Sequence, residues 1–149
     1  MANVVIPEKI HLLQINWVKE HNVILKNKLA KNPSYNFQMA HNMMHNLQSE
    51  VVKIRLFLDM SGEIEGKTIN QGGNYELDFL FKIDDLKDHY NIIEGKPVFS
   101  GVFVSTLLAI SFSTMRGMLF MLWKDTVLQQ VILPVISPPE LLRSTRKIA

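Results

Sequence analysis

Regular alternation of apolar and polar residues predicts two half-buried β-strands. In residues 50–60, the even positions from Val52 to Met60 are apolar and the odd positions from Lys53 to Asp59 are polar apart from Phe57. In residues 75–83, the odd positions are apolar and the even positions are polar apart from Leu80. A period of two is typical of a strand with one face on the core and the other face in water. The sequence therefore predicts an antiparallel pair of strands joined by a short glycine-containing segment.

The segments that flank this pair are less regular. Ser61-Gly62-Glu63 predicts a turn, Glu65–Ile69 a further short strand, and Gly72-Gly73 lies just before the second strand of the pair. Residues 84–96 are polar and charged, and they predict an irregular connection with one short strand around His89–Ile93.

The first 47 residues give a mixed pattern. Residues 11–25 predict a strand, although some of their apolar positions also fit a helical spacing. Residues 26–47 are the least regular part of the chain, with a turn signal at Asn32-Pro33-Ser34. The piece MAHNMMHNLQ that follows fits either a short helix or an extended segment.

One long apolar run, Val98–Trp123, predicts a helix because it is too long for a strand. Arg116 is its single charged residue, and Pro97 stands where a helix could begin. Pro134 then interrupts regular structure, and Ser137 is suited to cap a second, short helix over about Pro138–Arg146. Strands come first and helices last, so we expect an α+β fold in a single domain, residues 1–149.

The long run poses a choice between a membrane and burial by protein. A membrane span needs about 20 apolar residues, and the run is long enough. However, Arg116 would cost about 2.5–3.5 kcal/mol inside a bilayer, and several hydroxyl groups dilute the run. We therefore favour burial by protein, with a membrane-associated protein as the less favoured alternative. One small sheet covers only one face of such a helix, so the other face needs a second subunit or a client.

Composition narrows the function. The 149 residues are 47% apolar and 20% charged, which is ordinary for a soluble domain. Cysteine is absent, which excludes disulfides and thiolate chemistry and permits a reducing cytoplasm. The net charge of +2 is small and scattered, so nucleic acid is not an expected partner. The N-terminus lacks the pattern of a signal peptide.

Three motifs suggest chemistry and are better explained as structure. Gly62–Thr68 ends in GKT, but it is one residue too short between its glycines for a phosphate-binding loop and contains two glutamates, so we predict a β-turn. His41 and His45 lack a third metal ligand. The carboxylates around Asp84-Asp85 are interleaved with lysines and fit a solvated loop. We expect no enzyme activity, no metal and no cofactor.

Methionines gather with aromatic residues in the irregular segment. Thioether side chains adapt to varied partners and recur on promiscuous binding surfaces, although they also fill protein cores. For this segment we leave both interpretations open. Its apolar members are Tyr35, Phe37, Met39, Met43 and Met44.

Three stretches of the chain together carry a family pattern. The first is Glu50–Glu63, of the EVV…R…SGE kind. The second is Leu80-Phe81-Lys82-Ile83, and the third joins Met115-Arg116 to Leu133-Pro134-Val135 and to a short helix with Leu141-Leu142. They resemble the SecB chaperone family, and in particular its divergent SecB-like branch, in which the second stretch falls at the place of the third strand. The likeness covers roughly residues 11–145.

The resemblance implies a four-stranded antiparallel sheet with two helices and a homotetramer built as a dimer of dimers. It also implies apolar grooves that hold non-native polypeptide without ATP. The residues expected to contact a client are Trp17, Val23, Leu25, Tyr35, Phe37, Met39, Met43 and Met44. The residues expected at the oligomer interface, on the long helix, are Phe103, Leu107, Ile110, Ser111, Thr114 and Met118.

Charge separates this chain from SecB itself. SecB is strongly acidic and docks the SecA motor through acidic residues on its sheet, whereas this chain is slightly basic and has Lys82 at the place of one of them. Docking to SecA is therefore in doubt. We expect a cytoplasmic, ATP-independent chaperone dedicated to an antitoxin or a few clients. The alternative is a structural or adaptor oligomer that binds one folded protein partner.

Overall fold

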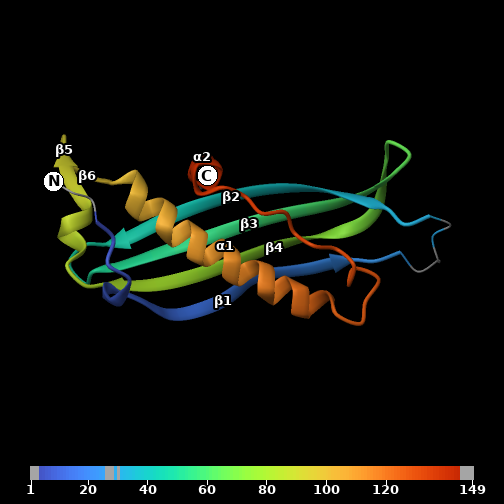
Figure 1. The fold of residues 1–149 in the computed structure, drawn as a ribbon, viewed down its shortest axis with the longest axis horizontal. Coiled ribbons are helices and arrows are strands. Elements are labelled where there is room, and N and C mark those ends of the chain that lie inside the picture. Colours follow the sequence, from blue (N-terminus) through green and yellow to red (C-terminus); the bar gives the residue numbers. More distant parts are fainter. Residues whose placement is uncertain (1–3, 26–28, 30, 145–149) are drawn as a thin grey trace.

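The computed structural model describes residues 4–25, 29 and 31–144 and shows an α+β fold. A four-stranded antiparallel sheet has the order β1-β4-β3-β2, and both α-helices lie on one of its faces (Figure 1). This confirms the predicted fold class. The sheet strands are β1 (Ile10–Val23), β2 (Ser34–Asn46), β3 (Val51–Ile64) and β4 (Lys67–Ile83). The other elements are 3-10 turns at Pro7–Lys9 and Leu86–His89, a hairpin of β5 (Tyr90–Ile93) and β6 (Lys96–Phe99), and helices α1 (Gly101–Trp123) and α2 (Pro138–Arg143).

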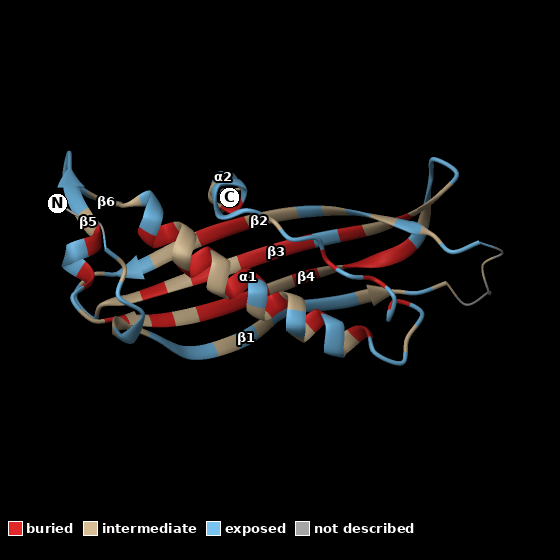
Figure 2. Cartoon of the chain, viewed as in Figure 1, coloured by how far each residue is buried: buried red, intermediate tan, exposed pale blue. Residues whose placement is uncertain are grey.

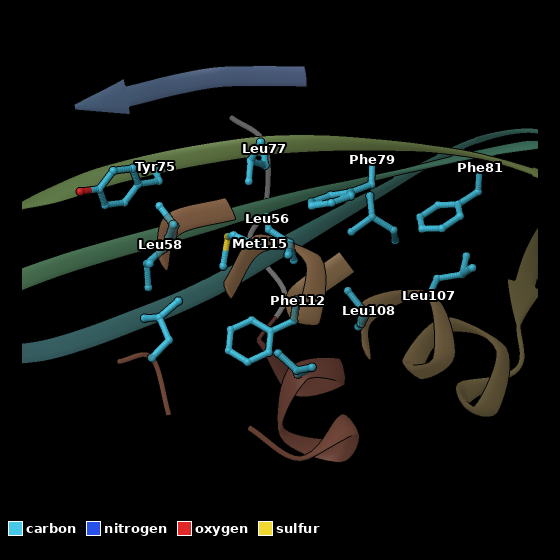
Figure 3. Close-up of a cluster of buried hydrophobic side chains, with 14 of the residues drawn as sticks. Leu56, Leu58, Tyr75, Leu77, Phe79, Phe81, Leu107, Leu108, Phe112 and Met115 are labelled. Atoms are coloured by element: carbon cyan, nitrogen blue, oxygen red, sulfur yellow. The ribbon is translucent and has the colours of Figure 1, made fainter. Parts of the chain in front are cut away.

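The two central strands, β3 and β4, supply most of the sheet's share of the core. Directly opposed residues such as Leu56 and Leu77 point to the same face, so the two alternating apolar rows meet under α1. Figure 3 shows these side chains packed against Leu107, Phe112 and Met115 of the helix. Burying each large apolar side chain contributes about 1.5–3 kcal/mol. The predicted alternation in β3 and β4 is confirmed.

The turn between β3 and β4 lies later than Ser61–Glu63, so that turn prediction was wrong. β3 continues to Ile64, and the chain reverses at Glu65-Gly66, where both residues have positive φ. This reversal confirms that the GKT motif belongs to a β-turn. The predicted short strand at Glu65–Ile69 forms the turn and the start of β4.

The glycine pair Gly72-Gly73 lies inside β4 rather than before it. A Cβ on Gly72 would lie 2.1 Å from the carbonyl oxygen of Met60, on the neighbouring strand β3. A Cβ on Gly73 would lie 2.3 Å from the hydroxyl oxygen of Tyr75. Glycine is therefore needed here for close packing, which explains why a pair that usually marks a loop continues a strand.

The two outer strands, β1 and β2, agree with the sequence predictions to different extents. Of residues 11–25, those up to Val23 form β1, as expected, although β1 pairs with β4 through two register shifts. The segment 26–47 is more regular than predicted, because Ser34–Asn46 forms β2. Of the two alternatives for MAHNMMHNLQ, the extended one is correct for its first eight residues. Residues 26–28 and 30 lie outside the described part.

The long helix begins after, not at, Pro97. Lys96–Phe99 forms β6, which pairs with β5 across a turn at Glu94-Gly95. The strand β5 agrees with the short strand predicted around His89–Ile93. Ser100 then caps α1, with its hydroxyl oxygen accepting a hydrogen bond from the backbone nitrogen of Phe103 at 3.2 Å.

Helix α1 buries one face on the sheet and leaves the other open (Figure 2). By length and hydropathy it is the one helix of the described residues that could cross a membrane, but 44% of its most apolar window is buried in the fold. Core helices of soluble proteins meet the same criterion. Arg116, the charged residue of the run, donates a hydrogen bond at 3.2 Å to the carbonyl oxygen of Leu133, on the segment that returns from α1 to α2.

The C-terminal helix α2 packs beside β2 and is shorter than predicted. Ser137 is its N-cap, with its hydroxyl oxygen accepting from the backbone nitrogen of Glu140 at 3.4 Å, and Pro138 opens the helix as expected. It ends at Arg143. Residues 145 and 146 of the predicted range lie outside the described part.

Candidate polypeptide-binding surface

An aromatic cluster fixes Trp17 on the sheet beside the C-terminal half of α1. Trp17 and Tyr75 lie with ring centroids 6.3 Å apart, and Tyr75 meets Trp123 edge-on at 5.8 Å. The indole nitrogen of Trp123 donates to the Tyr75 hydroxyl at 2.9 Å, and that hydroxyl donates to the side-chain oxygen of Asn22. Burial raises the pKa of Tyr75, so the phenol stays protonated and remains a donor.

Trp17 forms one wall of a shallow apolar depression on the surface. The opposite wall is one face of α1, whose lining residues are spaced three and four apart along the helix and therefore lie on the same side of it. Apart from a threonine and a glycine, the helix wall consists of two methionines and a leucine. The helix residues are Thr114, Gly117, Met118, Met121 and Leu122. This surface can accept apolar side chains of a partner and offers no charged group.

A second apolar row follows strand β2 on the same sheet face. Phe37, Met39 and Met43 lie opposite Met60, Leu58 and Ile54 of β3, so their side chains point toward the helices. Together with Tyr35 they pack at the rim of the core and remain partly exposed.

A third surface lies at the far end of the sheet, between the β1–β2 connection and the chain after α1. Its pocket, of about 250 Å³, contains apolar Leu25 and Val127 beside several carboxamides. The buried side chain of Gln71 holds this region together. Its oxygen accepts from the backbone nitrogen of Leu25 at 3.3 Å, and its nitrogen donates to the hydroxyl of Tyr35 at 2.9 Å.

His41, in the middle of β2, ties that strand to the end of α2. Its backbone nitrogen donates to the carbonyl oxygen of Ser144 at 2.8 Å, and its Nδ1 lies 3.0 Å from the Ser144 hydroxyl oxygen. That hydroxyl donates to the carbonyl of Leu141 at 2.6 Å, so it accepts from a protonated Nδ1. Burial lowers the pKa of His41 below its usual value. His45 instead contacts the ring of Phe99.

The structure separates the predicted client-binding residues. Trp17 and the β2 row share one sheet face but lie near its opposite edges, with β4 and β3 between them. Met44 and Val23 differ from the rest, because the strand register places both on the opposite face of the sheet. Met43 and Met44 therefore point to opposite faces of the sheet, since a strand sends neighbouring side chains to opposite faces, and client contact by Met44 and Val23 stays a prediction.

The predicted interface residues on α1 also divide into two groups. Phe103, Leu107 and Ser111 are completely buried in the core of a single chain, so in this conformation they are not available to a second one. These positions face the sheet of their own chain, and an interface role for them stays a prediction. Ile110, Thr114 and Met118 remain partly exposed, and their role at an interface stays a prediction.

Residue-by-residue reading of the sequence missed several parts of these surfaces. Gly117, Met121 and Leu122 complete the depression around Trp17, and their spacing relative to Thr114 and Met118 in the long run was an available signal. Gln71 had no signal, because its role depends on contacts between distant segments.

The other face of the sheet is polar and rich in ion pairs. Asp78 receives two hydrogen bonds from Arg55, at 2.7 and 2.9 Å, and lies 3.8 Å from the amine of Lys53. Lys82 lies 3.1 Å from a carboxylate oxygen of Glu50 and 3.6 Å from one of Asp84. Within residues 4–25, 29 and 31–144, no group of three or more His, Asp or Glu side chains could hold a metal ion.

The strand order and the two helices on one sheet face define the fold as SecB-like. A comparison with solved structures finds the Mycobacterium tuberculosis Rv1957 SecB-like chaperone in complex with a ChAD peptide from the Rv1956 HigA1 antitoxin. The TM-score is 0.63 at 13% sequence identity, over 87% of this chain and 92% of that chain. No protein-family model and no curated protein matches the sequence. The comparison establishes a shared fold.

Proposed function

We propose that this protein is an ATP-independent chaperone that binds extended or non-native polypeptide and is dedicated to an antitoxin or a few clients. The observation that carries the proposal is the pair of uncharged, partly exposed apolar surfaces beside α1 and along β2. Burial of apolar side chains there would supply about 25 cal/mol per Å² before ordering costs. The antitoxin peptide bound to the structurally similar chaperone supports the class of client.

The proposal extends to the assembly and its location. The exposed apolar side chains of α1, which are Val102, Phe120 and Met121, favour cover by further copies of the chain, and the assembly we propose is a homotetramer. A cytoplasmic location fits the absence of cysteine. On the polar sheet face, Lys82 is engaged by two carboxylates, which argues against a role like that of the docking acids of SecB.

Two neighbouring methionines allow a matched test. Met43→Asp places a charge in the apolar row of β2, whereas Met44→Asp places the same charge on the opposite sheet face. We expect the first variant to lose most of its suppression of aggregation of an unfolded client, and the second to keep it. Light scattering of the client measures the effect, and thermal unfolding of both variants controls for stability.

Two outcomes would contradict the proposal. Equal activity of the two variants would remove the β2 row from the site, and no suppression with any client would remove the chaperone function. A panel of unrelated unfolded proteins also tests the alternative function. Binding to a single folded partner and to none of the panel would indicate a structural or adaptor oligomer.

A further inference from the structure

Strand β2 is an edge strand without the features that normally protect a sheet edge. It runs for 13 residues, SYNFQMAHNMMHN, with no Asp, Glu, Lys, Arg or Pro. Its register with β3 continues without a shift. The other edge strand, β1, has two register shifts and the charged residues Lys19 and Glu20. Charges, prolines and bulges are the usual means of preventing an edge from pairing with another strand, so β2 is an open template.

One backbone hydrogen bond shows which groups of β2 point outward. The His41 nitrogen donates to the Ser144 carbonyl, which lies outside the sheet. Backbone groups that face one side of a strand recur at every second residue. Phe37 and Met39 therefore also direct their N–H and C=O groups to the outer edge. Among the described residues, His41 is the only member of β2 with a backbone partner there.

The same residues carry the apolar row. Phe37 and Met39 point their side chains to the helix-bearing face, opposite Met60 and Leu58. A strand added at this edge would therefore place every second side chain beside that row. Main-chain hydrogen bonds would supply affinity, and alternate apolar contacts would supply selectivity, as in other cases of strand addition.

The position of Ser144 restricts what can occupy the edge. Because Ser144 is bonded to His41, it interrupts the edge near its middle. The 13-residue β2 of a second copy could not run past this point. The stretch from Ser34 to Ala40 remains, which is seven residues long or about 23 Å. Because β2 has no Asp, Glu, Lys or Arg, we expect the partner segment to be uncharged as well.

We propose that the outer edge of Ser34–Ala40 binds a short, extended, uncharged segment of the client as an additional strand, with alternate apolar side chains against Phe37 and Met39. The inference rests on the proposed function and specifies how the client is recognised. Under this proposal, backbone N–H groups of the client contribute to binding. If the client were held by its side chains alone, those N–H groups would make no contribution.

A peptide with selectively methylated backbone nitrogens tests this mode of binding on the unaltered protein. The probe is the labelled peptide acetyl-GSVTFTVSG-amide, and fluorescence anisotropy measures its binding. One derivative is N-methylated at its Val and Phe residues, the other at its Thr residues. Only one of these sets can face β2: the apolar set if the added strand is antiparallel, the Thr set if it is parallel. We expect one derivative to bind at least about tenfold more weakly and the other to bind like the parent, since each hydrogen bond lost costs about fivefold.

The pattern of losses decides the outcome. Equal binding of the two derivatives, whether both retain or both lose affinity, would overturn the proposal. No binding of the parent peptide would also overturn it. If the protein still suppresses aggregation of an unfolded client in either case, the chaperone function stands and only main-chain recognition fails.

Two substitutions at one position separate the backbone donor from the side chain. Met39→Ala removes the thioether and keeps the N–H, whereas Met39→Pro removes both. Since the N–H of Met39 points outward, proline there breaks no hydrogen bond to β3. We expect the proline variant to bind the parent peptide about fivefold more weakly than the alanine variant. Equal affinities of two folded variants would contradict the proposal.

Discussion

Single polar side chains hold the apolar surfaces of this protein in position. Tyr75 is buried in the core, yet its hydroxyl links Trp123 of α1 to Asn22 of β1. Gln71 makes a similar link between Leu25 and Tyr35. A buried polar group that loses its partner costs more than an average hydrogen bond contributes. These residues therefore matter for the shape of the surface even though they present little to a partner.

Tyr75 offers a direct test at the residue scale. Tyr75→Phe should lower the free energy of unfolding by about 1–3 kcal/mol, because the Trp123 indole N–H loses its acceptor in a dry site. Urea denaturation measures the change. Tyr90→Phe is the matched control: Tyr90 is only partly buried, and its effect should stay within about 0.5 kcal/mol. Equal costs for the two variants would show that the buried hydrogen bonds contribute nothing specific.

At the scale of elements, the contact between α2 and β2 should respond to pH. Burial lowers the folded-state pKa of His41 below 6.5, so the unfolded chain binds the proton more readily. The contribution of His41 is complete above pH 6.5 and is lost as pH falls from there through the lowered pKa. Stability should therefore decrease on acidification in this range, and thermal unfolding between pH 7.5 and 5 would show it.

Histidine variants separate this contribution from others. His89 also has a pKa lowered by burial, so the wild-type slope has more than one source. His41→Gln, which can still donate to Ser144, should reduce the slope without removing it. His21→Gln changes an exposed side chain and serves as the control. An unchanged slope in His41→Gln would contradict the assignment.

The elements differ in how well the sequence predicted them, for reasons that lie in their surroundings. β3 and β4 alternate over most of their length because they are central and have one face on the core, although Phe57 and Leu80 are apolar on the other face. β2 was hard to recognise from the sequence because its core-facing row is interrupted by His41. The polar ring of His41 is hydrogen-bonded to Ser144, a residue 103 positions away. Gly72-Gly73 has the sequence pattern of a turn, but close packing of strands also requires glycine. Local patterns cannot show such distant contacts.

The sequence predicted only part of the candidate site, because the direction of each side chain depends on the kind of element that carries it. The sequence indicated Trp17 and the row of Phe37, Met39 and Met43, and the structure places all four on the helix-bearing face. The sequence could not assign Met44 to the other face before the segment was known to be a strand, since it is a strand that sends adjacent side chains to opposite faces. The surface therefore depends on strand register as much as on composition.

At the scale of the whole molecule, the exposed apolar side chains on α1 favour association of several chains. Val102 and Phe120 are each 55% exposed and Met121 is 63% exposed, all on the helix that the sheet only partly covers. Phe120 and Met121 are adjacent, and an exposed apolar patch of this kind is a candidate subunit interface. A homotetramer of the 17.1 kDa chain would have a mass of about 68 kDa. We expect light scattering after size-exclusion chromatography to give that mass at micromolar concentration.

A charge on the open helix face should break this assembly without unfolding the chain. Phe120→Asp places a carboxylate where the side chain is solvent-exposed in one chain, so the monomer fold tolerates it, whereas burial of that charge in an interface would cost several kcal/mol. The variant should elute with the mass of a smaller species and keep its far-ultraviolet circular dichroism. Val135→Asp, at an 82% exposed position on the segment before α2, is the control and should leave the mass unchanged. A wild-type protein that is monomeric at every concentration would disprove the tetramer, and an unaltered mass in Phe120→Asp would place the interface elsewhere, because a desolvated charge at a subunit contact cannot be accommodated at no cost.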